Sequence, residues 1–159
     1  MTFDIHLFDH FDWEAEDSET QFYEYKDALL ASFLESSEGQ ALEEQHPGAG
    51  FWTDQLMYYG YAYQGATPPE LSAGDVKEIL TDLFPHKISL STPDEADNAI
   101  PELIAFWQFL KREYGLKQSN AILNLLREAT SGFTRRMNDP ANFGMARSFF
   151  MMGAPPLLA

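Results

Sequence analysis

Apolar residues recur at three- and four-residue spacing in several separate stretches of the chain, and this spacing predicts amphipathic helices. The clearest stretches begin near residues 18, 53, 72, 101 and 119. Short connections between such helices favour neighbouring, roughly antiparallel packing. The side chains expected to face a common core include Phe22, Tyr25, Leu29, Phe33, Val76, Ile79, Leu80, Leu83, Leu103, Phe106, Trp107, Leu110, Ile122, Leu125 and Leu126.

Residues that start or stop helices flank these stretches. Ser18 with Gln21 resembles a capping box, in which a side chain accepts from the backbone of the first turn. Pro in a first turn and Gly just past a last turn are further boundary signals. The same reasoning predicts caps at Ser72 with Asp75, Pro101 in a first turn, Gly115 as a stop, and a last helix from Asp139 and Pro140 to Gly153.

Two short stretches have the period of a strand instead. Phe3, Ile5 and Leu7 alternate with polar residues, and Ile88 and Leu90 do the same after a proline. The expected fold class is therefore all-α: a compact bundle of five to six helices, allowing one short strand or hairpin, with an extended N-terminal arm. We expect the arm to be laid over the body by its aromatic residues.

The chain divides into three parts on this interpretation. Residues 1–17 form an acidic, aromatic N-terminal arm, residues 18–153 a helical domain, and residues 154–159 an apolar C-terminal strap. A chain of 159 residues with 45% apolar residues can bury one substantial core. It has no cysteine, no apolar run of eighteen residues and no basic-then-apolar leader. These features predict a cytoplasmic protein that does not span a membrane.

Charge is distributed unevenly along the chain, whose net charge is −15. Residues 1–47 carry a formal charge of −12, residues 48–100 carry −6, and residues 101–159 carry +3. Such a negative protein is repelled by phosphate backbones and by anionic lipid surfaces, so direct nucleic-acid binding is not expected. The acidic pole either serves solubility and attraction to the basic pole, or docks a basic partner protein.

The C-terminal end is unusually apolar for an acidic protein. On the predicted last helix, Phe143, Ala146 and Phe150 line one side, and Met145, Phe149 and Met152 line a neighbouring side. This second apolar line and the strap need a cover, which is either this domain or another chain. We therefore predict a non-enzymatic binding or accessory protein without a cofactor. Its partner is another protein, with a basic protein as one option, or a second copy of the chain. The predicted apolar anchors are Trp13, Phe149, Met152, Leu157 and Leu158.

A metal-dependent enzyme is the alternative function. His6 and His10 are four residues apart and would share one helix face, with carboxylates such as Asp9 beside them. The zincin signature needs a glutamate directly after the first histidine, where this chain has Leu7. Histidines that are incidental to an acidic arm explain the pattern more simply. A second alternative is an acidic inhibitor that imitates nucleic acid.

Arg135 and Arg136 are expected in a loop before the last helix. The two guanidinium groups could grip a phosphate or a carboxylate. The interpretation that we favour is that they complement the acidic pole or the C-terminus of a helix.

Three segments resemble an uncharacterised family of bacterial helical proteins. They are "FPHKISL", "IPELIAFWQFLKREYGL" and "FTRRMNDPANFGMARSFFMMG". In that family a Pro–basic–Lys step, a helix with a Phe–Trp pair and an F–G–x–A–Lys/Arg–S segment recur in this order. The resemblance covers roughly residues 50–153 and implies an all-α module with no assigned reaction. The chain departs from the pattern in carrying Arg147 where the family has Lys, and in ending shortly after Gly153.

Overall fold

Helices dominate the computed structural model, which describes residues 3–9, 14, 16–145 and 147–148. The α-helices are α1 (Ser18–Glu35), α2 (Ser37–Gln45), α3 (Phe51–Gln64), α4 (Ala73–Glu78), α5 (Phe84–Lys87), α6 (Ala99–Tyr114), α7 (Ser119–Ala129) and α8 (Phe133–Asn138). A π-helical segment, η2 (Ile79–Leu83), joins α4 to α5, and short 3₁₀ helices occur at η1 (Pro68–Glu70), η3 (Pro93–Asn98) and η4 (Pro140–Asn142).

The predicted all-α class is confirmed, while the predicted number of helices is too low. Since α4, η2 and α5 follow one another without interruption, the described residues form seven α-helical stretches rather than five or six. One additional helix is α8, where the sequence predicted only a loop containing Arg135 and Arg136. The predicted last helix is interrupted, because η4 ends at Asn142 and Phe143 has an extended backbone.

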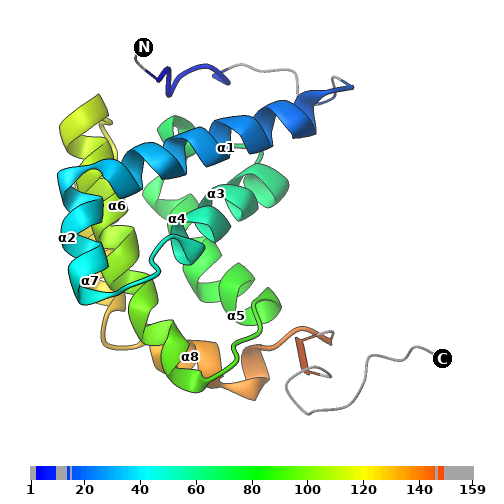
Figure 1. Ribbon diagram of the computed structural model, residues 1–159. Coiled ribbons are helices and arrows are strands. Elements are labelled where there is room, and N and C mark those ends of the chain that lie inside the picture. The colour runs from blue at the N-terminus through cyan, green and yellow to red at the C-terminus, as the bar shows by residue number, and fades with distance from the viewer. Residues whose placement is uncertain (1–2, 10–13, 15, 146, 149–159) are drawn as a thin grey trace.

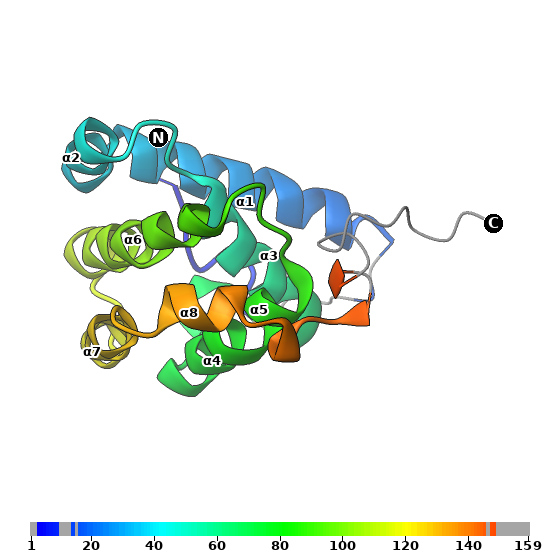
Figure 2. The ribbon, with the colours of Figure 1, turned by 90° about the horizontal axis from the view of Figure 1, so that it is seen from below.

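Helix α6 packs against α2, α3 and α7. Helix α1 crosses the top of the molecule and contacts α2 and α3 (Figure 1). Seen from below, α3 and α6 lie between α1 on one side and α4 and α7 on the other (Figure 2). No helix in the described ranges is both long and apolar enough to cross a bilayer.

The predicted inward face of α6 is the centre of the hydrophobic core. Leu103, Phe106, Trp107 and Leu110 are fully buried, and the ring of Phe106 lies 5.3 Å from that of Phe33 on α1. Close packing of large side chains on several elements is the main stabilising contribution to a domain of this size.

Both predicted strands are wrong within the described residues. Residues 5–9 form turns, with Leu7 N–H donating to Asp4 C=O at 3.2 Å, and Leu7 is 59% exposed whereas Ile5 and Phe8 are buried. The hydroxyl of Tyr25 donates to the Ile5 carbonyl at 2.6 Å. A strand needs a partner strand for its backbone groups, and here turns and a side chain on α1 satisfy them instead.

The segment with Ile88 and Leu90 also lacks strand pairing. Both side chains are buried, and Ile88 N–H donates to Phe84 C=O at the end of α5. In this segment the alternation of apolar residues predicted the burial of the side chains correctly. It predicted the hydrogen bonding of the backbone wrongly.

Local helix signals predicted some boundaries well. Ser72 and Asp75 form a reciprocal capping box, and Gly115 ends α6 in the left-handed conformation at φ 61°. The predicted box at Ser18 is wrong, because Asp17 is the N-cap of α1. The Gln21 side chain bonds to the Asp17 carboxylate at 2.6 Å instead of reaching back to a backbone N–H.

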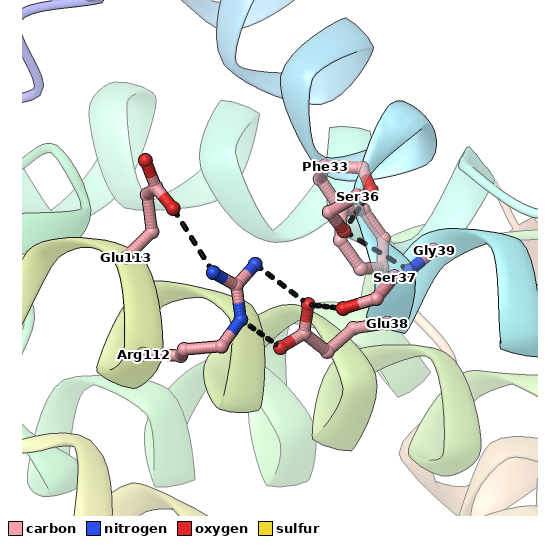
Figure 3. A network of polar contacts seen from close by, with 7 residues as sticks. All are labelled: Phe33, Ser36, Ser37, Glu38, Gly39, Arg112 and Glu113. Carbon is pink, nitrogen blue, oxygen red and sulfur yellow. Dashed lines mark hydrogen bonds and ion pairs between the residues drawn. The ribbon is translucent and has the colours of Figure 1, made fainter.

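An ion pair joins α2 to α6 (Figure 3). Arg112 donates through Nε and Nη2 to the two oxygens of Glu38, at 2.6 and 2.9 Å, and through Nη1 to Glu113 at 3.0 Å. The hydrogen bonds from Arg112 to the Glu38 carboxylate lower the pKa of Glu38 to about 2. At the N-terminus of α2, Ser36 Oγ accepts from Gly39 N–H at 3.1 Å, so the helix start beside the ion pair is capped.

Arg147 holds the last described residues against the bundle. It is 2% exposed and donates to the carbonyls of Pro85 and Met137 near the ends of α5 and α8. Burial lowers the pKa of its guanidinium to about 10. Next to it, Gly144 N–H donates to His86 C=O at 2.8 Å. This segment is thus anchored by backbone carbonyls of two helices.

Candidate functional site

A cleft of about 360 Å³ opens beside the N-terminus of α3. Its walls come from the end of α2, the loop that follows, the start of α3, the segment after α5, η3 and α6. The lining residues are His46, Pro47, Gly48, Ala49, Phe51, Trp52, Ser89, Ser91, Glu95, Asn98 and Glu102.

The loop of residues 46–50 turns the chain sharply from α2 into α3. Gly48 and Gly50 have φ values of 83° and 133°, which side-chain-bearing residues rarely adopt. The Glu43 carboxylate accepts from the backbone N–H groups of Gly48 and Ala49, at 2.9 and 3.3 Å. This wall of the cleft is therefore built by backbone conformation and by one carboxylate from α2.

Glu102 lines the cleft and accepts hydrogen bonds from the backbone at the start of α3. Gly50 is the N-cap of α3 and has no side chain to accept from the first turn. Instead, Gly50 N–H donates to Glu102 Oε1 at 2.9 Å and Thr53 N–H donates to Glu102 Oε2. Glu102 is 3% exposed and lies in the first turn of α6. Its negative charge thus lies at the positive ends of two helix dipoles.

The opposite wall is held by two further polar contacts. Ser91 N–H donates to Glu95 Oε2 at 3.0 Å. His46 Nδ1 lies 3.0 Å from Asn98 Oδ1, which connects the end of α2 to the end of η3. Because the imidazole is bonded to an amide, and no described hydrogen bond joins it to Ser89 or Ser91, the cleft does not present an activated serine.

An exposed aromatic ring stands beside these polar groups. Phe51 is 50% exposed, whereas the adjacent Trp52 is 3% exposed and packs 5.5 Å from Phe84 and 5.9 Å from Phe133 in the core. The rings of Phe51 and Trp52 meet edge to face at 5.1 Å. Phe51 is thus a large apolar side chain presented at a rigid helix start.

The charges around the cleft are of one sign. Its described lining contains two carboxylates, from Glu95 and Glu102, and no lysine or arginine. A neighbouring depression contains Glu43 and Glu44 and likewise no described basic residue. Backbone N–H groups donate to the carboxylates of Glu102 and Glu43. Glu44 is exposed and Glu95 is partly exposed, so these two carboxylates direct negative charge outward. The cleft can accept a cationic group next to an apolar one.

The exposed side of α1 adds to this negative field. Its lysine, Lys26, is 7% exposed, pairs with Asp54 of α3 and lies 3.6 Å from Asp27. No ion pair to Glu24 or Glu35 is found among the described residues, and both are exposed. The lysine of α1 is therefore buried and paired with a residue of α3. The exposed face of α1 is left with acidic side chains.

The predicted metal ligands are brought together only in part. His6 Nδ1 lies 2.8 Å from Asp9 Oδ2, with the two side chains 56% and 32% exposed. His10 lies outside the described residues. Within those residues, no group of three or more His, Asp or Glu side chains is arranged to hold a metal ion. The metal-enzyme alternative stays a prediction.

The five predicted partner anchors all lie outside the described residues: they are Trp13, Phe149, Met152, Leu157 and Leu158. The strap of residues 154–159 also lies outside them. The cleft residues Phe51 and Glu102 were missed by sequence reasoning. A glycine in the N-cap position of α3 was the signal that could have indicated a distant acceptor such as Glu102.

The chain was compared with protein-family models, with characterised proteins and with solved structures. None of the three comparisons found a match. The resemblance to a bacterial helical family therefore remains a prediction, and the geometry of the cleft is the basis for the function proposed below.

Proposed function

We propose that this protein is a cytoplasmic binding or accessory protein that docks a basic segment of a partner protein. The docking site is the cleft at the start of α3, and the mechanism is non-covalent. The observation that carries the proposal is the combination of an exposed Phe51 with a described lining that contains carboxylates and no lysine or arginine.

Physical complementarity supports a segment in which lysine or arginine adjoins an apolar residue. An aromatic side chain at a rigid site is a typical anchor of protein interfaces, because it buries a large area at a small entropic cost. A lysine or arginine on the partner can lie over the Phe51 ring and also approach Glu95. The hydrogen bonds around Glu102 keep the start of α3 in place before the partner arrives.

The acidic outer face of α1 supports the same partner chemistry. Unpaired surface carboxylates raise the association rate of a basic partner and make that rate sensitive to salt. The acidic face therefore contributes to encounter, while the cleft contributes to the lifetime of the complex.

The test is affinity capture from an extract of the source organism, followed by calorimetry with the purified partner. The wild type should retain a basic protein, and Phe51→Ala should weaken its binding about tenfold or more. Tyr63→Ala is the matched control, because Tyr63 lies on the same helix with an exposure of 52%, against 50% for Phe51. It should change the affinity less than twofold.

Raising the salt concentration from about 50 to 300 mM should slow association much more than dissociation. Capture of no protein, or equal capture by wild type and Phe51→Ala, would contradict the proposal. A partner that depends on Tyr63 rather than on Phe51 would move the interface to the other end of α3.

A further inference from the structure

A second pocket, of about 260 Å³, lies between α4 with η2, α7 and α8, and it shares no lining residue with the cleft. It is lined by Lys77, Leu80, Thr81, Leu125, Glu128, Ala129, Ser131, Gly132, Phe133 and Arg136. The loop predicted around Arg136 is helical, and α8 carries this side chain to the rim of the pocket.

The floor of this pocket is apolar. Leu80 and Phe133 are 2% and 4% exposed, and Leu125 and Ala129 are partly buried against the same core. Thr81 Oγ1 donates to the Lys77 carbonyl at 2.8 Å, so this hydroxyl already has an acceptor within its own helical segment. A ligand for the floor therefore needs an apolar body.

The rim of the pocket has the opposite sign to the rest of the protein. Lys77 and Arg136 both line it, and neither makes an ion pair among the described residues, although the chain has 25 acidic residues. Glu128 is the acidic member of the described lining, so the formal charge there is +1. A singly charged anion balances this formal charge, whereas a doubly charged phosphate would exceed it and would be repelled by Glu128 about twice as strongly.

We propose that this pocket binds a small organic carboxylate with a compact apolar body. The apolar body lies on Leu80, Leu125 and Phe133, and the carboxylate accepts hydrogen bonds from the guanidinium fork of Arg136 and from Lys77. The pocket volume suits a ligand of about a dozen non-hydrogen atoms, at the small end of protein ligand sites.

The experiment uses the full chain with 4-phenylbutyrate as the probe and 4-phenylbutanol as its uncharged match. Backbone amide shifts in NMR titrations should place phenylbutyrate in this pocket, with the largest shifts at Leu80, Ala129 and Phe133 and a dissociation constant on the order of 1 mM or below. The alcohol should bind about tenfold more weakly. Arg136→Gln should weaken phenylbutyrate binding about tenfold and should leave the alcohol almost unaffected.

Arg135→Gln is the matched control, because it removes the same charge from the adjacent residue, which does not line the pocket. It should change the affinity less than twofold. Equal weakening by both arginine variants would show that net charge alone is sensed and would overturn the proposal. Tighter binding of the alcohol than of the carboxylate, or no saturable shift at about 10 mM probe, would also overturn it.

Discussion

Replacing Glu102 tests whether one buried carboxylate organises both the cleft and the start of α3. In Glu102→Ala, the N–H groups of Gly50 and Thr53 lose their acceptor. A hydrogen bond to a charged group contributes about 1.5–3 kcal/mol, so removing two should lower the free energy of unfolding by about 3–6 kcal/mol. Glu102→Gln keeps the shape and one acceptor oxygen, and should cost about 2 kcal/mol.

The assay is urea unfolding followed by circular dichroism at pH 7, with hydrogen exchange of the Gly50 and Thr53 amides measured in parallel. In Glu102→Gln, exchange should accelerate at one of these two amides, since the NH₂ group cannot accept while the remaining oxygen still can. Glu44→Ala is the control, because Glu44 is exposed, and it should stay within about 0.5 kcal/mol of the wild type. A Glu102→Ala protein within about 1 kcal/mol of the wild type would refute the reasoning.

Two further predictions concern contacts between elements. The pKa of Glu38 is lowered from 4.5 to about 2 in the folded state, so the stabilisation by Arg112 is present above pH 4.5 and is lost as the pH falls towards 2. Urea midpoints of wild type and Arg112→Gln should therefore differ at pH 6 and converge near pH 2; a constant difference would contradict this. A Cβ on Gly144 would lie 2.6 Å from His86 Nε2, so Gly144→Ala should destabilise by about 1–3 kcal/mol in thermal unfolding. Gly132→Ala, which meets nothing within 4 Å, should have almost no effect, and equal melting temperatures for the two variants would argue against this close contact.

The helices could be predicted because the signals that form them are local. The three- and four-residue spacing of Leu103, Phe106, Trp107 and Leu110 identifies the buried face of α6, and all four are fully buried. The box of Ser72 and Asp75 acts within one turn, so it can be recognised without knowledge of the rest of the chain.

Strand pairing is not local, and both strands predicted from the sequence are wrong within the described residues. Ile5 is buried as its pattern suggests, but Leu7 two residues later is exposed, because the arm turns to meet Tyr25. An alternating pattern reports which residues can be buried, while a strand also requires a partner with free backbone groups.

The candidate site depended on contacts between residues far apart in the chain. Glu102 caps a helix that begins about fifty residues earlier, and Lys26 pairs with Asp54 on a neighbouring helix. Nothing adjacent to these residues distinguishes them from the solvated charges of an acidic chain. Their burial and their partners follow only from the packing of α1, α3 and α6.

By itself, then, the sequence determined the helical class, most of the core positions, several helix ends and the charge polarity. These properties depend on composition and on interactions within one or two turns. The tertiary structure decided which charges are buried, which aromatic side chain stands exposed at the cleft, and that Arg136 shares a pocket with Lys77. Helix packing decides such features, because it brings together side chains that no local pattern connects.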